Sequence, residues 1–161
     1  MMLQGSAHME WEGDMSVIEA INVSPAHGQP QAPVNAAQLT SVAGLVGDRH
    51  SNGRAVVSLI AAEEVEAFNE ATGLDIAPAQ TGRNIVTRGV DLNALVTKRF
   101  RLAGVELEGF ELCEPCATLG GLLATEGVSA AEVVRRFTHR AGLRATVRAD
   151  GWIRVGDAVE V

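Results

Sequence analysis

Two cysteines separated by two residues have the clearest capacity for chemistry in the chain, in the segment Cys113-Glu114-Pro115-Cys116. The spacing is typical of redox motifs and of half a zinc site, but structural zinc needs four ligands and the chain has no other cysteine. A thioredoxin-like role would place the first cysteine at a helix start, whereas here only Cys116 is placed to begin one. Backbone donors of that helix would stabilise a Cys116 thiolate. We interpret Cys113 as a packing residue and leave both a structural and a functional role open for Cys116.

A second candidate is the segment Gly47-Asp48-Arg49-His50, which places an acid, a base and a titratable imidazole in one turn. Asp48 and His50 are its candidate catalytic groups. In the alternative interpretation Asp48 only caps the turn while Arg49 and His50 point to solvent, and the local pattern alone favours this alternative. The remaining histidines are assigned to structural or surface positions: His8, His27 and His139.

The basic residues are unusual, because twelve are arginines and only one, Lys98, is a lysine. Arginine binds phosphate and carboxylate groups through paired hydrogen bonds, which lysine does not. In Gly82-Arg83-Asn84 a glycine that lets the backbone approach a ligand precedes two side chains rich in donors. In the alternative interpretation, a codon bias of the genome explains most of the arginine excess. The candidate anion-binding arginines are Arg49, Arg54, Arg83, Arg88, Arg140 and Arg144.

Length and composition limit the classes of protein and partner. With 161 residues, of which 47% are hydrophobic and 20% charged, the chain suits one domain with a sizeable core. Thirteen basic and twenty acidic residues give a net charge of -7, so neither nucleic acid nor an anionic membrane is an expected partner. No apolar stretch reaches the roughly 20 residues of a membrane helix, and no signal peptide is evident. Two cysteines suit a reducing compartment, so we expect a soluble cytoplasmic protein.

Residues 1–14 contain internal methionines and a Gly-Ser-x-His-Met pattern, so we expect an expression-tag remnant or a disordered N-terminus there. A single domain is placed at residues 15–161. Its most regular pattern predicts a helix over residues 61–72, with Ser58 as a cap and Gly73 at its end. A break in alternation at Ala103-Gly104 predicts two strands joined by a turn or bulge.

The remaining pattern consists mostly of short strands between glycine and proline turns. Further strands are predicted after residue 16 and after residue 54, and a closing β-meander over residues 144–161. Two short helices are predicted, one over residues 119–125 and one that begins at a capping box at Ser129. Many short strands with a few inserted helices indicate a mainly-β or α+β barrel rather than a doubly wound sheet.

Taken in order, these motifs resemble the MOSC domain, named after the C-terminal domain of molybdenum cofactor sulfurase. The resemblance extends from about Val17 to Val161. It rests on the segments 44–50, 54–56, 82–92, 115–116, 142–145 and 153–157. It implies a MOSC-like β-barrel that binds a molybdopterin-type molybdenum cofactor, with Cys116 of Pro115-Cys116 as the thiolate ligand of the metal.

The resemblance also implies a reaction and partners. Relatives reduce N-hydroxylated small molecules with electrons from separate redox proteins. In that interpretation the pocket residues that position cofactor and substrate are Asp48, Arg49, His50, Arg54, Arg83 and Asn84. Family members often have Glu where Arg83 precedes Asn84, so this chain departs from the family there.

Two other functions stay open. One is a sulfur or molybdenum-cofactor carrier, in which Cys116 holds a persulfide supplied by a partner such as a cysteine desulfurase. The other is a binding module without a bound metal. Pyridoxal phosphate belongs to the family's separate desulfurase domain, which this sequence does not show, and Lys98 alone does not predict a covalent site for it.

Overall fold

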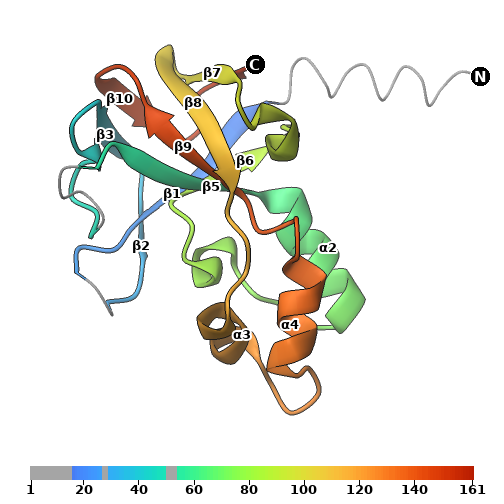
Figure 1. Cartoon of the computed structure of the whole chain (residues 1–161). Coiled ribbons are helices and arrows are strands. Elements are labelled where there is room, and N and C mark those ends of the chain that lie inside the picture. The colour runs from blue at the N-terminus through green and yellow to red at the C-terminus, as the bar shows by residue number, and fades with distance from the viewer. Residues whose placement is uncertain (1–15, 27–28, 50–53) are drawn as a thin grey trace, which may run out of the picture.

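The computed structural model describes residues 16–26, 29–49 and 54–161 (Figure 1). The predictions made for residues 1–14, for His27 and for His50 lie outside these described residues. Within them, two β-sheets form the upper part of the molecule in Figure 1, and three α-helices lie at one end of the larger sheet. None of the described helices is long and apolar enough to cross a membrane.

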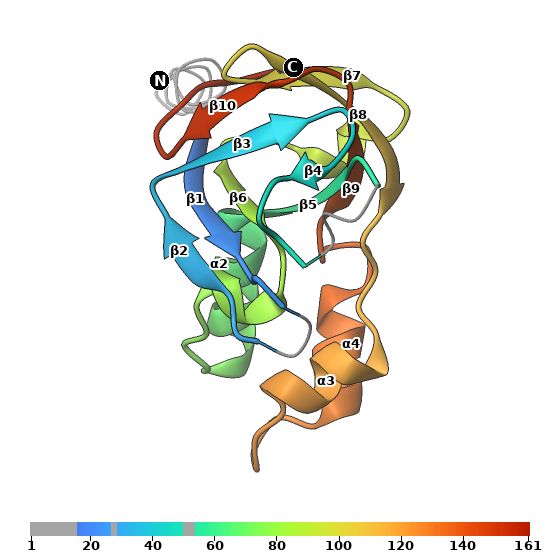
Figure 2. The same ribbon diagram turned by 90° about the vertical axis from the view of Figure 1, so that its left-hand side faces the viewer.

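The larger sheet has eight strands and forms most of a barrel. In spatial order they are β11 (Val159–Glu160), β7 (Arg99–Leu102), β8 (Val105–Leu112), β9 (Leu143–Val147), β5 (Val56–Ala61), β6 (Ile85–Arg88), β1 (Val17–Val23) and β2 (Ala32–Val34). All neighbours are antiparallel except β5 and β6, which are parallel. The sheet curls until the Ile18 N–H, on β1, donates to the Asp157 carbonyl beside β11 at 2.9 Å (Figure 2). The predicted mainly-β, α+β class is therefore confirmed.

A smaller sheet of three antiparallel strands covers one side of the barrel. Its order is β10 (Gly151–Arg154), β3 (Ala36–Thr40) and β4 (Gly44–Leu45). The predicted meander over residues 144–161 is wrong, because its three strands do not pair with one another. Instead β9 pairs with β5 and β8, β10 pairs with β3, and β11 pairs with β7. Alternation of apolar residues indicates a strand but does not identify its partner, which depends on contacts distant in sequence.

The helices confirm most of the predicted local signals. They are α2 (Ala62–Thr72), α3 (Ala117–Leu123) and α4 (Ala130–Phe137), with short 3-10 turns η1 (Pro78–Thr81) and η2 (Leu92–Leu95). Gly73 ends α2 in a left-handed conformation, with φ of 78°. The Ser129 hydroxyl caps α4 by accepting the Glu132 N–H at 3.1 Å. Ser58 does not cap a helix, because it lies inside β5.

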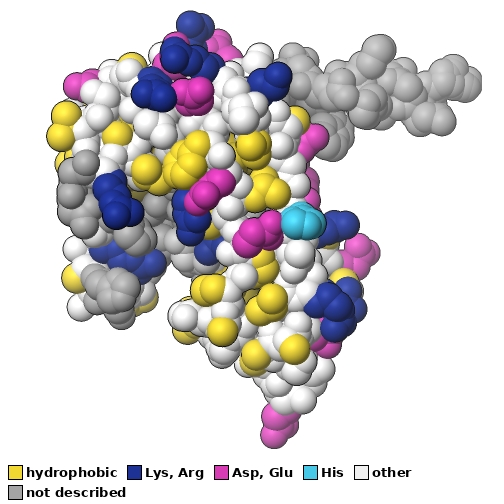
Figure 3. All heavy atoms as spheres, viewed as in Figure 1, with side chains coloured by type: hydrophobic (Ala, Val, Ile, Leu, Met, Phe, Trp, Pro, Cys, Tyr) yellow, Lys and Arg dark blue, Asp and Glu magenta, His cyan; other side chains and the backbone are white. Residues whose placement is uncertain are grey.

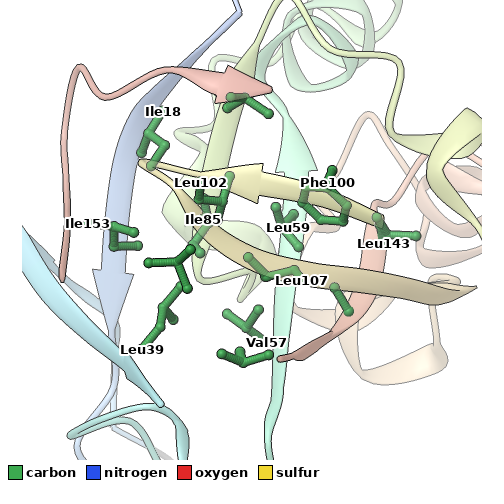
Figure 4. Close-up of a cluster of buried hydrophobic side chains, with 14 of the residues drawn as sticks. Ile18, Leu39, Val57, Leu59, Ile85, Phe100, Leu102, Leu107, Leu143 and Ile153 are labelled. Atoms are coloured by element: carbon green, nitrogen blue, oxygen red, sulfur yellow. The ribbon is translucent and has the colours of Figure 1, made fainter. Parts of the chain in front are cut away.

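Two hydrophobic cores lie on opposite faces of the strands. Leu59 and Ile85 point into the barrel core (Figure 4). The neighbouring Ile60 and Val86 belong to the second core, with the helices. This burial on both faces is typical of a parallel strand pair. In the helical core the rings of Phe68 and Phe137 stack with centroids 4.5 Å apart, which joins α2 to α4.

Replacing Phe68 with Ala should lower the free energy of unfolding by about 3–5 kcal/mol, because the change leaves a cavity beside Phe137. Chemical denaturation measured by circular dichroism tests this. Leu122→Ala is the matched control, since Leu122 on α3 is 71% exposed, and its effect should stay within about 0.5 kcal/mol. Equal effects of the two changes would contradict the packing described for Phe68.

Candidate functional site

A cleft of about 520 Å³ opens beside the strands β5, β8 and β9. Its walls are Arg49, Arg54, Val56, Ser58, Gly82, Arg83, Asn84, Phe110, Glu111, Cys113 and Arg144. Basic side chains gather beside a hollow between the sheet and the helices in Figure 3. The loops that precede β5 and β6 supply most of the polar groups, so the barrel itself fixes their spacing.

Four of the six candidate anion-binding arginines meet at this cleft: Arg49, Arg54, Arg83 and Arg144. The other two do not line it. Arg88 lies on the outer surface between Glu19 and Glu66, each 2.5 Å away. Arg140 pairs with Glu64 at 3.4 Å. The sequence therefore indicated the arginine cluster but not which members form it.

Arg83 is anchored to the protein by three backbone carbonyls. Its Nε donates to Ala141 at 2.9 Å, its Nη1 to Thr81 at 2.9 Å and its Nη2 to Cys113 at 3.2 Å. These acceptors belong to three separate segments of the chain. Arg83 therefore holds the cleft wall together and keeps a positive charge at a fixed place in it.

Asp48 and Asn84 form a buried polar network, of which Asn84 belongs to the cleft wall and Asp48 does not. The Asp48 carboxylate accepts the Ser24 N–H at 2.9 Å and the Asn84 side-chain amide at 3.1 Å. The same amide nitrogen donates to the Asn22 carbonyl, and the Ser58 hydroxyl donates to the Asn84 side-chain oxygen, both at 3.1 Å. Two predicted site residues are thus in contact, and their contacts fasten the loop after β4 to β1 and to the start of β6.

Arg49 and Arg54 keep donors available for a ligand. Arg49 is held by its main-chain N–H, which donates to the Ser24 carbonyl at 2.7 Å. Its Nε is buried and has no hydrogen-bond partner within the part of the chain that the structure describes. Arg54 is exposed at the cleft edge. A buried unpaired donor is costly, so this arrangement favours an acceptor that enters from the cleft.

Phe110 and Glu111 are cleft residues that sequence reasoning missed. Gly109 of β8 pairs with Ala145 of β9, and Glu111 pairs with the next residue along β9, Arg144. Phe110 lies between them without a partner of its own in β9, so it is the extra residue of a β-bulge. The bulge breaks the alternation that made β8 recognisable. Arg144 donates to Glu111 at 2.6 Å, and this contact raises the pKa of Arg144. The described cleft wall contains four arginines and one carboxylate, Glu111, so it has an excess of positive charge.

The two cysteines have different environments. Cys113 is 4% exposed, in agreement with its predicted packing role, and it also forms part of the cleft wall. Cys116 is exposed and precedes the first turn of α3 as its cap residue. Its thiol does not cap the helix with a hydrogen bond. The backbone N–H of Leu119 nevertheless lowers the pKa of Cys116, and Thr118 and the charge of Arg83 lower it further. Cys116 is not itself a residue of the cleft wall, but it follows the wall residue Cys113 by three positions and has a pKa below that of an ordinary thiol.

No group of three or more His, Cys, Asp or Glu side chains that could hold a metal ion occurs in residues 16–26, 29–49 and 54–161. A metal at Cys116 would therefore need further ligands from a cofactor or from solvent.

Cys116 should react with iodoacetamide at a lower pH than an ordinary thiol, because only the thiolate attacks and the pKa of Cys116 is lowered. The rate should fall as the pH drops through that lowered value. Replacing Arg83 with Met should move the midpoint upward, since a nearby cation is removed. Fragment-ion mass spectrometry separates Cys116 from the buried Cys113, and a midpoint at or above that of a free thiol would contradict the prediction.

Replacing Asn84 with Ala should lower the free energy of unfolding by about 1–3 kcal/mol, because buried hydrogen-bonding groups of Asp48, Ser58 and Asn22 lose a partner. Urea denaturation measures the change. Asn35→Ala is the control, because the Asn35 side chain is exposed. A loss no larger than that of the control would show that the network does not secure the loop.

Solved structures with the same fold support the architecture. The YuaD protein from Bacillus subtilis is 18% identical with a TM-score of 0.80, over 90% of this chain and 94% of that one. YiiM from Geobacillus stearothermophilus is 13% identical with a TM-score of 0.70, over 90% of this chain and 74% of that one. YiiM from Escherichia coli is 19% identical with a TM-score of 0.64, over 89% and 68%. At these identities the likeness establishes the fold alone.

A search of curated protein sequences gives no match. The model of the MOSC domain family, however, matches residues 46–160, which include β5 to β11, all three helices and every residue of the cleft wall. The match covers well over half of the chain and agrees with the fold. The chain therefore belongs to the MOSC domain family.

Proposed function

We propose that this protein binds a molybdopterin-type molybdenum cofactor in the cleft, with Cys116 as the thiolate ligand of molybdenum. The observation that carries the proposal is the exposed Cys116, its pKa lowered, beside a cleft lined by four arginines. A soft thiolate suits molybdenum, and arginine suits the cofactor's phosphate. The arginines line one cavity, and Cys116 follows the wall residue Cys113 by three positions.

The described residues fit such a group in size, charge and donor chemistry. The volume of about 520 Å³ lies in the range of ordinary ligand sites. The buried Arg49 Nε and the exposed Arg54 would bind the phosphate, whereas Arg83 is already committed to the Thr81, Cys113 and Ala141 carbonyls. Because protein side chains alone form no metal cluster among the described residues, the cofactor would bring the remaining ligands.

We further propose that the substrate is an N-hydroxylated small molecule. When bound, the molybdenum cofactor supplies the two-electron chemistry that removes the hydroxyl oxygen, with electrons from a separate redox protein. The exposed ring of Phe110 at the cleft would pack against a planar substrate. Asp48 would act by holding the loop that carries Arg49, and a catalytic role for Asp48 and His50 stays a prediction.

The exposure of Cys116 favours a second candidate, a sulfur or cofactor carrier. An exposed thiolate accepts a persulfide sulfur from a partner such as a cysteine desulfurase more readily than a buried thiol does. Pyridoxal phosphate would then belong to the partner. Lys98, the one lysine of the chain, is not among the residues of the cleft wall.

Protein expressed in cells that make the cofactor should contain molybdenum when measured by elemental analysis. Cys116→Ala should lose most of it, and Arg54→Ala should lose part, because each change removes a predicted contact. Arg140→Ala is the matched control, since this exposed arginine lies away from the cleft and should leave the content unchanged.

The same preparations separate the candidate functions. A metal-free wild-type protein, indistinguishable from Cys116→Ala, would overturn the cofactor proposal. Cyanide-labile sulfur that depends on Cys116, without turnover of an N-hydroxylated substrate, would favour the carrier. A tightly bound ligand without molybdenum in the purified protein would favour a binding module.

A further inference from the structure

The segment that holds Cys116 has no regular secondary structure of its own. Residues 113–116 connect the end of β8 to the start of α3. The first residue is secured on both sides, because the Cys113 N–H donates to the Gly142 carbonyl at 2.7 Å and its carbonyl accepts from Arg83 at 3.2 Å. The position of residues 114–116, which precede α3, depends on other contacts.

Glu114 provides the next attachment through both carboxylate oxygens. Its Oε1 accepts the His139 N–H at 2.7 Å, and its Oε2 lies 2.6 Å from the His139 ring Nδ1. Two contacts to one residue fix the direction of the side chain as well as its position. We call this pair, Glu114 with His139, the clamp.

His139 is a fixed partner because other contacts secure its backbone. It follows α4 in a left-handed conformation, with φ of 63°. Its carbonyl accepts the Asn93 side-chain amide at 2.8 Å, and the Arg140 N–H donates to the Phe137 carbonyl at 2.8 Å. The clamp therefore ties the Cys116 segment to a turn that keeps its shape independently of Glu114.

The stability of the fold does not account for this arrangement. The side chains of His139 and Glu114 are 72% and 42% exposed, and exposed pairs of this kind contribute little to stability. Neither residue belongs to the two hydrophobic cores. The contact does, however, attach the residue that follows Cys113, whose carbonyl accepts from Arg83, and that stands two positions before Cys116.

We propose that the clamp of Glu114 and His139 is a positioning device that holds Cys116 beside the arginines of the cleft. Neither clamp residue belongs to the cleft wall. The inference rests on the proposed function in one respect only, since it takes Cys116 as the working thiolate.

The test measures the alkylation rate of Cys116 in the folded chain of 161 residues at one fixed pH, without molybdenum. Glu114→Ala should slow the reaction by about threefold or more, because the thiol is no longer held near the positive charges. Glu114→Gln, which keeps the shape and an acceptor for the His139 N–H, should recover part of the rate. His139→Asn should lose less than Glu114→Ala, since asparagine tolerates the left-handed backbone and retains the main-chain N–H.

Glu126→Ala is the matched control, because Glu126 is an exposed carboxylate beyond the other end of α3. Its rate and thermal unfolding midpoint should equal those of the wild type. An unchanged rate in Glu114→Ala would overturn the proposal, and so would an equal loss in the control. The proposal would also be overturned if both Glu114 variants had a lowered thermal unfolding midpoint and an equally slow alkylation rate, because the slow rate would then reflect lost stability.

The result is independent of the molybdenum measurement. If Cys116→Ala keeps its molybdenum while Glu114→Ala slows alkylation, the proposed function fails and the positioning role stands. If Cys116→Ala loses molybdenum while Glu114→Ala reacts at the wild-type rate, the reverse holds.

Discussion

The guanidinium of Arg83 is the contact on which the candidate site depends. Its hydrogen bonds to the Thr81, Cys113 and Ala141 carbonyls join the turn before β6, the cysteine segment and the turn before β9. These segments are far apart in sequence, and no regular secondary structure connects them directly. Glutamate at this position would accept rather than donate and could not make these bonds. The same side chain brings a positive charge near Cys116, so support and electrostatics come from one residue.

Charge is distributed unevenly in this acidic chain. The net charge is -7, yet four arginines meet at the cleft, where Glu111 is already paired with Arg144. An overall negative surface discourages binding to nucleic acid, while the local excess of donors favours one small anion. The buried Asp48 is not among the residues of the cleft wall, and its carboxylate accepts hydrogen bonds from Ser24 and Asn84.

The sequence predicted the structural features that depend on neighbouring residues, but not the strand pairings and contacts between residues far apart in the chain. The helix at Ala62–Thr72, the Ser129 cap and the strand break at Ala103-Gly104 follow from periodicity and capping within a few residues. The pairing of β10 with β3, across more than a hundred residues, left no local trace. Likewise the motifs indicated Arg83 and Asn84, but not that both are engaged with backbone and buried side chains. Phe110 was missed because a bulge interrupts the alternation on which strand prediction relies.

That bulge has a consequence for how relatives of this protein can diverge. Gly109 sits so close to the η2 turn that a Cβ on it would lie 2.3 Å from the Leu95 carbonyl oxygen, so the register of β8 up to this residue is locked. Beyond it, the single extra residue Phe110 decides which side chains face the cleft. Deletion of Phe110 would leave Glu111 opposite Arg144 and the barrel core intact, but it would remove the exposed Phe110 ring from the cleft wall. The cleft could thus acquire a different lining through a change of chain length, without any substitution in its wall.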